Sequence, residues 1–171
     1  MQERAQAVRL MIFDVDGVMT DGSLYYTDDG QELKAFNSLD GHGLKMLRQS
    51  GVQLAIITGR RSRLVEHRAA NLGIDHLYQG AHDKLATFGE LLAATGFSAE
   101  QCGYMGDDLV DLPVMRRVAF AVAVPESPDL VRHHAHYVTG AGAGRGAVRE
   151  VCELLMQSQG TFEAQVAPYL R

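Results

Sequence analysis

The sequence is poor in cysteine and has no long apolar run. Its two cysteines, Cys102 and Cys152, lie far apart, which argues against a disulfide and predicts two reduced, buried thiols. No apolar stretch reaches the length that spans a membrane, and residues 1–8 (MQERAQAV) lack the apolar core of a signal peptide. We therefore expect a cytoplasmic protein with no membrane partner.

Clustered positive charge is also missing. The chain has 16 Lys and Arg against 21 Asp and Glu, a formal net charge of -5, and no basic run or basic patch interleaved with aromatics. This composition argues against nucleic acid as a partner. Hydrophobic residues make up 46% of the chain and charged residues 22%, as is typical of a folded globular protein. We expect residues 1–171 to form a single domain with a sizeable core.

Apolar runs alternate with amphipathic helical patterns along most of the chain. Buried strands are predicted at 8–15, 54–58, 76–80, 102–106, 119–124 and 137–139. Helices are predicted between and after them at 43–51, 62–73, 84–96, 112–117, 127–135 and 146–157. This alternation predicts a three-layer, doubly wound, Rossmann-like α/β fold, in which helices cover both faces of a parallel sheet. Ligands bind beyond the carboxyl ends of the strands in this architecture.

One segment, at about 23–36, interrupts the alternation. Its sequence predicts a β-hairpin that turns at Asp28, Asp29 and Gly30, with apolar residues such as Tyr25 and Tyr26 on both faces. A lone two-stranded hairpin is only marginally stable in water. We therefore expect this hairpin to pack against another surface, and the chain has no second domain to supply one.

Polar residues collect where the predicted strands end. Asp14 and Asp16 follow the first strand and project to the same side, where two like charges repel unless a cation or a proton lies between them. Thr58 ends the second strand, the helix after the third strand begins near Lys84, and Asp107, Asp108 and Asp111 follow the fourth strand. Carboxylates suit Mg²⁺, and a lysine with a hydroxyl suits a phosphoryl group. In such a site Asp14 can attack phosphorus, while Asp16 protonates the leaving alkoxide and later activates water.

The order of these motifs resembles the four-part signature of the haloacid dehalogenase superfamily of phosphohydrolases. The parts are D-x-D-G-V-x-T-D-G at 14–22, a strand that ends in Thr-Gly-Arg at 58–60, a lone lysine, and G-D-D-x-x-D at 106–111. The resemblance implies that Asp14 is the nucleophile, Asp16 the acid and base, and Thr58 and Lys84 the phosphoryl-binding residues. It also implies an Mg²⁺ ion held by Asp14, Asp107 and the Asp16 carbonyl, with Asp108 and Asp111 behind these ligands.

Only the hairpin separates the first motif from the next helix, so the chain resembles the branch of the superfamily that has no cap domain. The match covers nearly the whole chain and implies a phosphatase that acts on an eight-carbon sugar acid phosphate in lipopolysaccharide sugar biosynthesis. The substrate-binding residues that it implies are Asp16, Asn37, Ser38, Leu39, Asp40, Gly41, Lys45, Arg60, Arg68, Lys84 and Arg145. Lys45 stands where the branch is expected to have an arginine, which would grip a carboxylate with two hydrogen bonds.

Two of the arginines also stand out by their positions in the chain. Arg68 lies between Leu64 and Leu72 on the inward stripe of its predicted helix, where its alternatives are a snorkelling stem or a structural ion pair. Arg60 lies near a helix start, where the helix dipole disfavours positive charge, so an anionic partner would explain it.

Two rival functions stay open. A nine-carbon keto-deoxy sugar acid phosphate could be the substrate, although Arg60 after Thr58-Gly59, where that variant has an acid, favours the eight-carbon one. A phospho-acceptor signalling domain also uses Asp, Thr and Lys at strand ends, but its phosphorylated Asp lies on a middle strand. Two other patterns carry no functional prediction: the histidines at 133, 134 and 136, and the glycine-rich segment 142–147, which we expect to be part of a flexible tail.

Without a cap domain, the reacting phosphate would be open to water unless another subunit covers it. Four hairpins could close into a small barrel that removes their free edges, so we expect a homotetramer. The resemblance implies the same assembly, with the glycine-rich tail and terminal helix at about 140–171 carrying Arg145 to a neighbouring site. The alternative is a hairpin that folds back on its own domain, with a merely mobile tail.

Overall fold

The computed structural model describes all residues, 1–171, and contains one six-stranded parallel sheet. The strands are β1 (Leu10–Phe13), β4 (Gln53–Thr58), β5 (His76–Gln79), β6 (Cys102–Met105), β7 (Phe120–Ala123) and β8 (Tyr137–Val138). Their order in the sheet is β5-β4-β1-β6-β7-β8, and every neighbouring pair is parallel. The chain therefore leaves β1 toward β5 and returns to the other side of β1 at β6. This arrangement creates a crevice at the carboxyl ends of the central strands.

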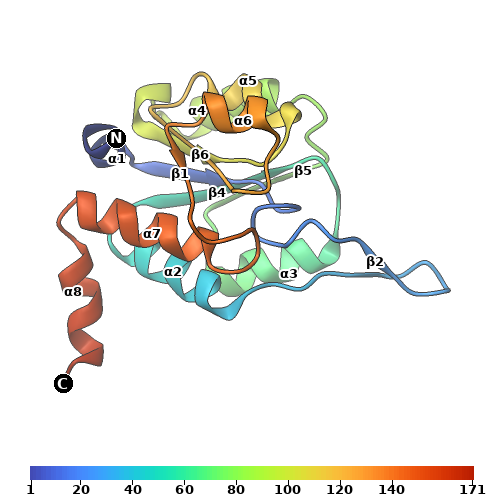
Figure 1. The fold of residues 1–171 in the computed structure, drawn as a ribbon, viewed down its shortest axis with the longest axis horizontal. Helices are drawn as coiled ribbons and strands as arrows, with labels where there is room; N and C mark the ends of the chain where they lie inside the picture. The colour runs from blue at the N-terminus through green and yellow to red at the C-terminus, as the bar shows by residue number, and fades with distance from the viewer.

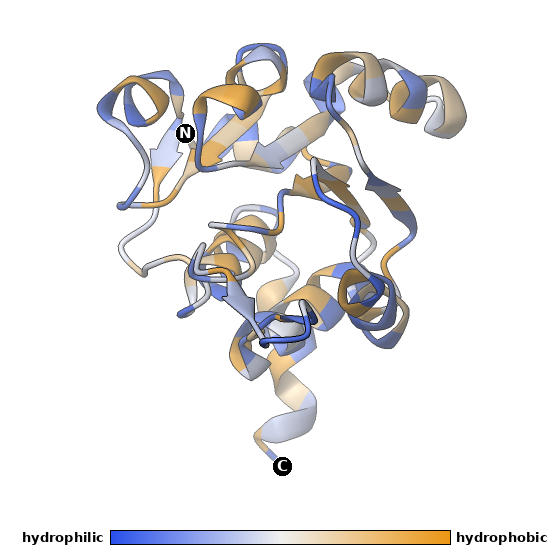
Figure 2. Ribbon diagram, turned by 90° about the vertical axis from the view of Figure 1, so that its right-hand side faces the viewer, coloured by the Kyte–Doolittle hydropathy of each residue, from blue (hydrophilic) through white to orange (hydrophobic).

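Helices cover both faces of the sheet (Figure 1). One layer contains α2 (Ser38–Gln49), α3 (Arg63–Leu72) and α7 (Ala147–Ser158), and the other contains α4 (Lys84–Thr95), α5 (Leu112–Met115) and α6 (Asp129–His134). Side chains of β1 alternate between the two layers, with Met11 and Phe13 in one core cluster and Leu10 and Ile12 in the other. Every residue of β1, β6 and β7 is buried, and hydrophobic segments lie on strands and on helices of the fold (Figure 2). The predicted three-layer α/β fold is confirmed.

Several element boundaries differ from the prediction. Helix α2 begins at Ser38, five residues before the predicted start, because the Asn37 side chain accepts hydrogen bonds from the amides of Leu39 and Asp40 and caps it. Helix α6 begins at Asp129, after Pro128. The sequence patterns did not indicate α1 (Gln2–Ala7), α8 (Phe162–Val166) or the short 3-10 turns at Ala99–Gln101, Leu109–Asp111 and Ala167–Tyr169.

The inserted hairpin is present and extends away from the sheet (Figure 1). Strands β2 (Tyr25–Tyr26) and β3 (Glu32–Leu33) pair antiparallel over only two residues each. The apolar side chains of the hairpin are about half exposed: Leu24, Tyr25, Tyr26 and Leu33. The hairpin therefore leaves an apolar surface that its own chain does not cover.

The glycine-rich segment 140–146 packs on the loop that follows β1, so the expectation of a flexible tail is wrong here. The Gly144 amide donates to the Val18 carbonyl at 3.1 Å, and the Glu150 carboxylate accepts from the amides of Gly140 and Ala141. Gly144 has a φ of +63°, and a Cβ atom there would lie 2.6 Å from the Asp21 amide nitrogen. Only glycine fits this close approach.

The cysteines and histidines that stand out in the sequence make structural contacts. Cys102 and Cys152 are free and buried, as predicted. The ring of His136 accepts a hydrogen bond from the Ala121 amide, and the ring of His133 contacts the Asp129 carbonyl. No helix is both long and apolar enough to cross a membrane.

Candidate active site

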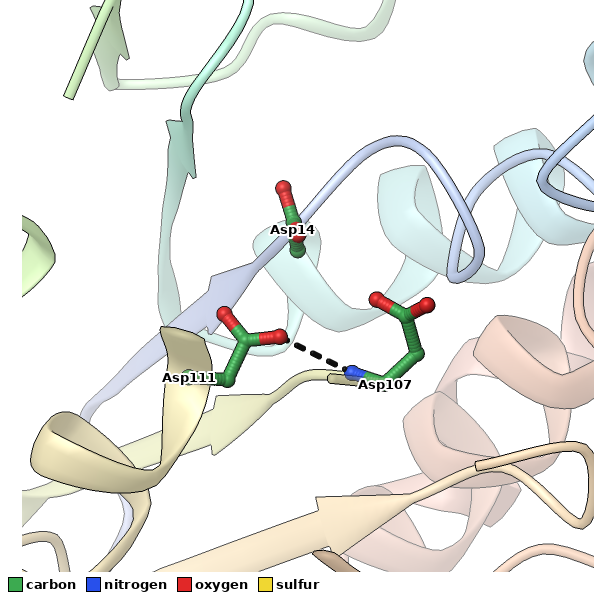
Figure 3. A group of neighbouring side chains, drawn as sticks. All are labelled: Asp14, Asp107 and Asp111. Carbon is green, nitrogen blue, oxygen red and sulfur yellow. Dashed lines mark hydrogen bonds between the residues drawn. The ribbon is translucent and has the colours of Figure 1, made fainter. Parts of the chain in front are cut away.

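Three carboxylates meet at the carboxyl ends of the two central strands (Figure 3). Asp14 directly follows β1, Asp107 lies two residues beyond β6, and Asp111 ends the 3-10 turn that comes next. One carboxylate oxygen from each residue lies within 4.8 Å of the other two. The cluster forms because parallel strands end at the same edge of the sheet.

The loop after β1 is shaped to approach this cluster closely. Gly17 has a φ of +84°, and a Cβ atom at this position would lie 2.1 Å from the Asp107 Oδ2 atom. The buried Thr20 hydroxyl accepts hydrogen bonds from the amides of Gly17 and Gly22, which closes the loop on itself. The glycine and threonine of the first motif therefore serve the geometry of the loop.

Lys84 connects two of the carboxylates. It is the first residue of α4 and is buried, and its Nζ atom donates to Asp14 Oδ2 at 2.7 Å and to Asp111 Oδ1 at 2.6 Å. Thr58 ends β4 beside β1 and is also buried. The structure thus brings Asp14, Thr58, Lys84 and Asp107 to one edge of the sheet, as predicted from their positions at strand ends and, for Lys84, at a helix start.

Both oxygens of the Asp111 carboxylate already accept two hydrogen bonds each from the protein. Its Oδ1 atom accepts from Lys84 and from the Tyr104 hydroxyl, both at 2.6 Å, and its Oδ2 atom accepts from the amides of Asp107 and Asp108 at 3.0 and 3.1 Å. The neighbouring Asp108 carboxylate accepts from the Leu109 amide and caps the 3-10 turn, and it lines the same hollow as Asp107. Asp111 therefore orients Lys84 and Asp107 and has no free oxygen lone pair for a cation, which fits its predicted place behind the ligands.

The electrostatics of the cluster favour a bound cation. Burial raises the pKa of Asp14 to about 6, although the Lys84 ammonium opposes this shift. Burial, followed by the charges of Asp14 and Asp111, raises the pKa of Asp107 to about 7. A divalent cation with oxygen ligands would remove this penalty on the charged carboxylates. The Asp14 and Asp107 side chains therefore fit the Mg²⁺ ion that the sequence predicted.

The Asp16 side chain points toward the hairpin. Its Oδ1 atom accepts from the Lys34 ammonium at 2.5 Å, and the Arg60 guanidinium lies 3.8 Å from its Oδ2 atom. Lys34 also contacts Glu32 at 3.2 Å, while Arg60 donates to Glu32 at 3.0 Å and to the Tyr26 hydroxyl at 2.7 Å. Burial acts to raise the pKa of Glu32, but its bonds to Lys34 and Arg60 lower the pKa overall. Glu32 and Lys34 were not predicted as site residues, because both lie outside the four-part signature.

Arg68 lies against the predicted substrate-binding segment 37–41. Its Nη2 atom donates to the Asn37 carbonyl at 2.9 Å, and its guanidinium lies 5.5 Å from the centre of the Phe36 ring. A Cβ atom on Gly41 would lie 2.3 Å from Arg68 Nη2. The structure therefore brings Arg68 and this segment together. Ser38 and Leu39 are exposed in the first turn of α2.

Three further residues that were predicted to bind substrate make other contacts in this structure. The Asp40 carboxylate is buried and accepts from the Arg149 amide in the first turn of α7 at 2.8 Å, so it caps α7. Lys45 is exposed and lines a separate hollow with Asn71 and Gly73. Arg145 lies close enough to Asp21 of the same chain for its charge to help lower the pKa of that carboxyl, after hydrogen bonds to Ser23.

Hollows of opposite charge flank the cluster. A hollow of about 370 Å³ beyond the end of β4 is lined by Gly59, Arg60, Arg61, Gly80 and His82. Another, of about 270 Å³, lies beside Asp107, and its lining includes Gly17, Asp21, Asp108 and Glu126. The basic hollow suits the anionic end of a substrate, and Arg61 and His82 in it were not singled out from the sequence.

Comparisons with known proteins agree with this geometry. Residues 76–151 match the model of the haloacid dehalogenase-like hydrolase family. The chain is 53% identical to the 3-deoxy-D-manno-octulosonate 8-phosphate phosphatase KdsC of Yersinia pestis over 161 residues, which are 94% of this chain and 86% of the relative. It is 49% identical to KdsC of Escherichia coli K12 over 160 residues, which are 94% of this chain and 85% of that protein.

Solved structures extend the likeness to three dimensions. The 3-deoxy-D-manno-octulosonate 8-phosphate phosphatase of Moraxella catarrhalis, determined with a magnesium ion, a phosphate ion and a KDO molecule, is 43% identical. Its TM-score is 0.96, and the match covers 98% of this chain and 97% of that one. The cobalt-bound phosphatase of Haemophilus influenzae is 35% identical with a TM-score of 0.93, and the match covers 98% of this chain and 99% of that one. The chain therefore belongs to the haloacid dehalogenase-like hydrolases, in the family of 3-deoxy-D-manno-octulosonate 8-phosphate phosphatases.

Proposed function

We propose that this protein hydrolyses 3-deoxy-D-manno-octulosonate 8-phosphate to the free sugar acid and phosphate, in the synthesis of a lipopolysaccharide sugar. The observation that carries the proposal is the buried cluster of Asp14, Lys84, Asp107 and Asp111 in a chain that matches phosphatases of this substrate over 94% of its length. The enzyme is a phosphoric monoester hydrolase that works through an aspartyl phosphate.

The residues of the cluster divide the chemistry between them. Asp14 attacks phosphorus, and its orientation is held by the Val15 amide at 2.7 Å and by Lys84. Lys84 and the Thr58 hydroxyl bind the phosphoryl oxygens and stabilise the charge that builds on them. Asp16 donates a proton to the leaving alkoxide and then takes one from the water that hydrolyses the aspartyl phosphate.

The Asp14 and Asp107 carboxylates, together with the Asp16 backbone carbonyl, would hold the Mg²⁺ ion. When bound, the ion supplies positive charge that neutralises the phosphoryl oxygens and lets both carboxylates stay ionised in a buried site. Asp111 keeps Lys84 and Asp107 in place through its four hydrogen bonds.

The substrate also carries a carboxylate, which needs positive charge away from the phosphate. Arg60 and Arg61 line the basic hollow, and Arg68 lies against the segment 37–41, so these arginines would bind the sugar acid. Arg60 currently pairs with Glu32 and Tyr26, which the substrate carboxylate would replace. Lys45 and Arg145 stay predictions as substrate-binding residues, with Arg145 reaching the site of a neighbouring subunit.

Phosphate release from a panel of sugar phosphates, with and without Mg²⁺, tests the proposal. We expect the eight-carbon sugar acid phosphate to have a higher kcat/KM than a nine-carbon keto-deoxy acid phosphate and than neutral hexose phosphates. Chelation of the metal should abolish turnover. A preference for the nine-carbon substrate would change the substrate assignment, and a stable phosphoprotein without turnover would favour a signalling domain.

We also propose that the enzyme is a homotetramer assembled through the hairpin. The half-exposed Tyr25, Tyr26 and Leu33 form an apolar surface on two strands that are too short to be stable alone. Pairing of hairpins from several subunits would cover this surface and satisfy the free strand edges. A cytoplasmic location stays a prediction from the sequence.

A further inference from the structure

A closed ring of four alternating charges joins the hairpin to the acid–base residue. Its members are Asp16, Lys34, Glu32 and Arg60, and the successive contacts measure 2.5, 3.2, 3.0 and 3.8 Å. Asp16 belongs to the loop after β1, Glu32 and Lys34 to the hairpin, and Arg60 to the loop after β4. Three segments that are distant in the sequence therefore meet in this ring.

Lys34 is the most buried member of the ring. Its side chain is 2% exposed, against 20% for Asp16 and 43% for Arg60. An ammonium taken out of water is costly unless carboxylates and hydrogen bonds compensate for the lost hydration. The Lys34 ammonium can therefore stay in this place only while Asp16 and Glu32 both face it.

The contact also restrains Asp16. The hydrogen bond from Lys34 is the only one that the Asp16 carboxylate makes with the chain, whereas Asp14 is held by both Val15 and Lys84. Lys34 directly follows β3, so its position depends on how the hairpin is held. Without Lys34 the Asp16 side chain would be free to rotate away from the reacting phosphate.

We propose that Lys34 is a positioning residue for Asp16, which sets the orientation of the acid–base carboxylate and makes that orientation depend on the hairpin. The inference rests on the proposed phosphatase function. It deepens that function, because the hairpin then contributes to catalysis from within its own chain as well as to assembly.

The test compares esters that differ in leaving group. The constant kcat/KM, which covers the steps up to formation of the aspartyl phosphate, is measured for phenyl phosphate, p-nitrophenyl phosphate and the sugar acid phosphate. General acid catalysis contributes about 10²–10⁴-fold where the leaving group needs a proton. Lys34→Met should therefore lower kcat/KM for phenyl phosphate and the sugar phosphate about tenfold more than for p-nitrophenyl phosphate. Lys34→Arg, which keeps the charge, should restore part of the loss.

A second arm asks whether Lys34 acts through Asp16. In an Asp16→Asn background, Lys34→Met should have little further effect on phenyl phosphate hydrolysis, where the single variant shows its large loss, because the carboxylate that Lys34 orients is gone. Equal losses on all three esters, additive losses in the double variant, or unchanged kinetics of Lys34→Met would each overturn the inference. If Lys34→Met does not fold, kcat/KM for the three esters is compared in Glu32→Gln instead, because this variant removes the charge of the other carboxylate that contacts Lys34.

The matched control is Arg48→Met. Arg48 forms an exposed ion pair with Asp75 at 3.2 Å, and its loss should leave kcat/KM unchanged for all esters. If the unaltered protein releases no phosphate from any ester, the proposed function and this inference both fail. If it releases phosphate but the Lys34 variants show no leaving-group dependence, the inference alone fails.

Discussion

At the scale of single residues, the properties of the site follow from its buried carboxylates and the one buried ammonium among them. The Lys84 ammonium contacts two of the three clustered carboxylates, and Asp107 has no cation of its own in the chain. Burial therefore raises the pKa values of Asp14 and Asp107 to about 6 and about 7. Such carboxylates need either protons or a metal ion at neutral pH, which makes both activity and stability depend on the metal.

The first prediction concerns Asp14→Asn. We expect phosphate release to fall to background, because an amide cannot form the aspartyl phosphate. The midpoint of thermal unfolding should stay within a few degrees of the wild type, since the substitution keeps the side-chain shape and removes a buried charge. Asp129→Asn, at an exposed position in α6, is the control and should keep full activity. Turnover by Asp14→Asn near the wild-type rate would contradict the mechanism.

The second prediction concerns pH and Mg²⁺. The raised pKa values mean that the metal-free folded state binds more protons than the unfolded state between pH 4 and about 7. The free energy of unfolding should therefore fall as the pH rises through this window, by about 2–4 kcal/mol, and Asp107→Asn should flatten the profile. Thermal melts at pH 7 should show that Mg²⁺ stabilises the wild type more than Asp107→Asn. An equal effect of Mg²⁺ on both proteins would place the ion elsewhere.

The third prediction concerns Arg68→Ala. Arg68 lies beside the segment 37–41, so its loss should raise KM for the sugar acid phosphate by about tenfold or more, the effect of one charge-assisted hydrogen bond. KM for a small neutral phosphate ester should change little. Arg63→Ala, at an exposed position in the first turn of α3, is the control. Equal changes for both substrates would remove Arg68 from the substrate site.

At the scale of elements, caps and close approaches place the functional residues. Asn37 starts α2, Ser62 starts α3 and Asp83 starts α4, each through a side-chain bond to a backbone amide. The cap on α4 puts Lys84 at the first helical position, where its side chain reaches the sheet edge. The glycine-rich segment 140–146 approaches the loop after β1 so closely that no side chain fits at Gly144.

The fourth prediction tests that approach. Gly144→Ala should lower the free energy of unfolding by about 1–3 kcal/mol, because the new methyl group meets the backbone of Thr20 and Asp21 at a positive φ. It should also lower kcat/KM, since the loop after β1 carries the catalytic residues. Gly89→Ala is the matched control: Gly89 is exposed inside α4 with open space around it, so alanine should stabilise the protein by about 0.5–1 kcal/mol. Denaturant melts measure the free energy of unfolding of both variants. A change of the same sign in Gly144→Ala and Gly89→Ala would contradict the prediction.

At the scale of the whole molecule, the hairpin is an incomplete element. It makes only two residue pairs, extends from the body and exposes Tyr25 and Leu33 by about half (Figure 1). Its inner end is charged and tied to Asp16 through Lys34. The outer part therefore suits contact with other subunits, while the inner part touches the site of its own chain.

The fifth prediction is that the Tyr25→Asp, Leu33→Asp double variant dissociates the proposed tetramer, because charges could not be buried in an apolar contact between hairpins. Sedimentation velocity should show tetramers for the wild type and monomers for the variant. The monomer should also lose activity, since the hairpin then no longer holds Lys34. An active monomer with unchanged kinetics would show that the assembly does not serve the site.

The sequence by itself determined the three-layer fold and the residues at the strand ends. Alternating apolar runs and helical patterns are local signals, and Asp14, Thr58, Lys84 and Asp107 meet because parallel strands end at one edge. The tertiary structure alone decided which residues hold this site. Lys34 reaches Asp16 across 18 positions and Asp40 caps α7 across 109, and neither contact leaves a periodic pattern in the chain. Such contacts depend on how the hairpin and helices pack, so side-chain geometry, burial and charge compensation in the folded protein decide them.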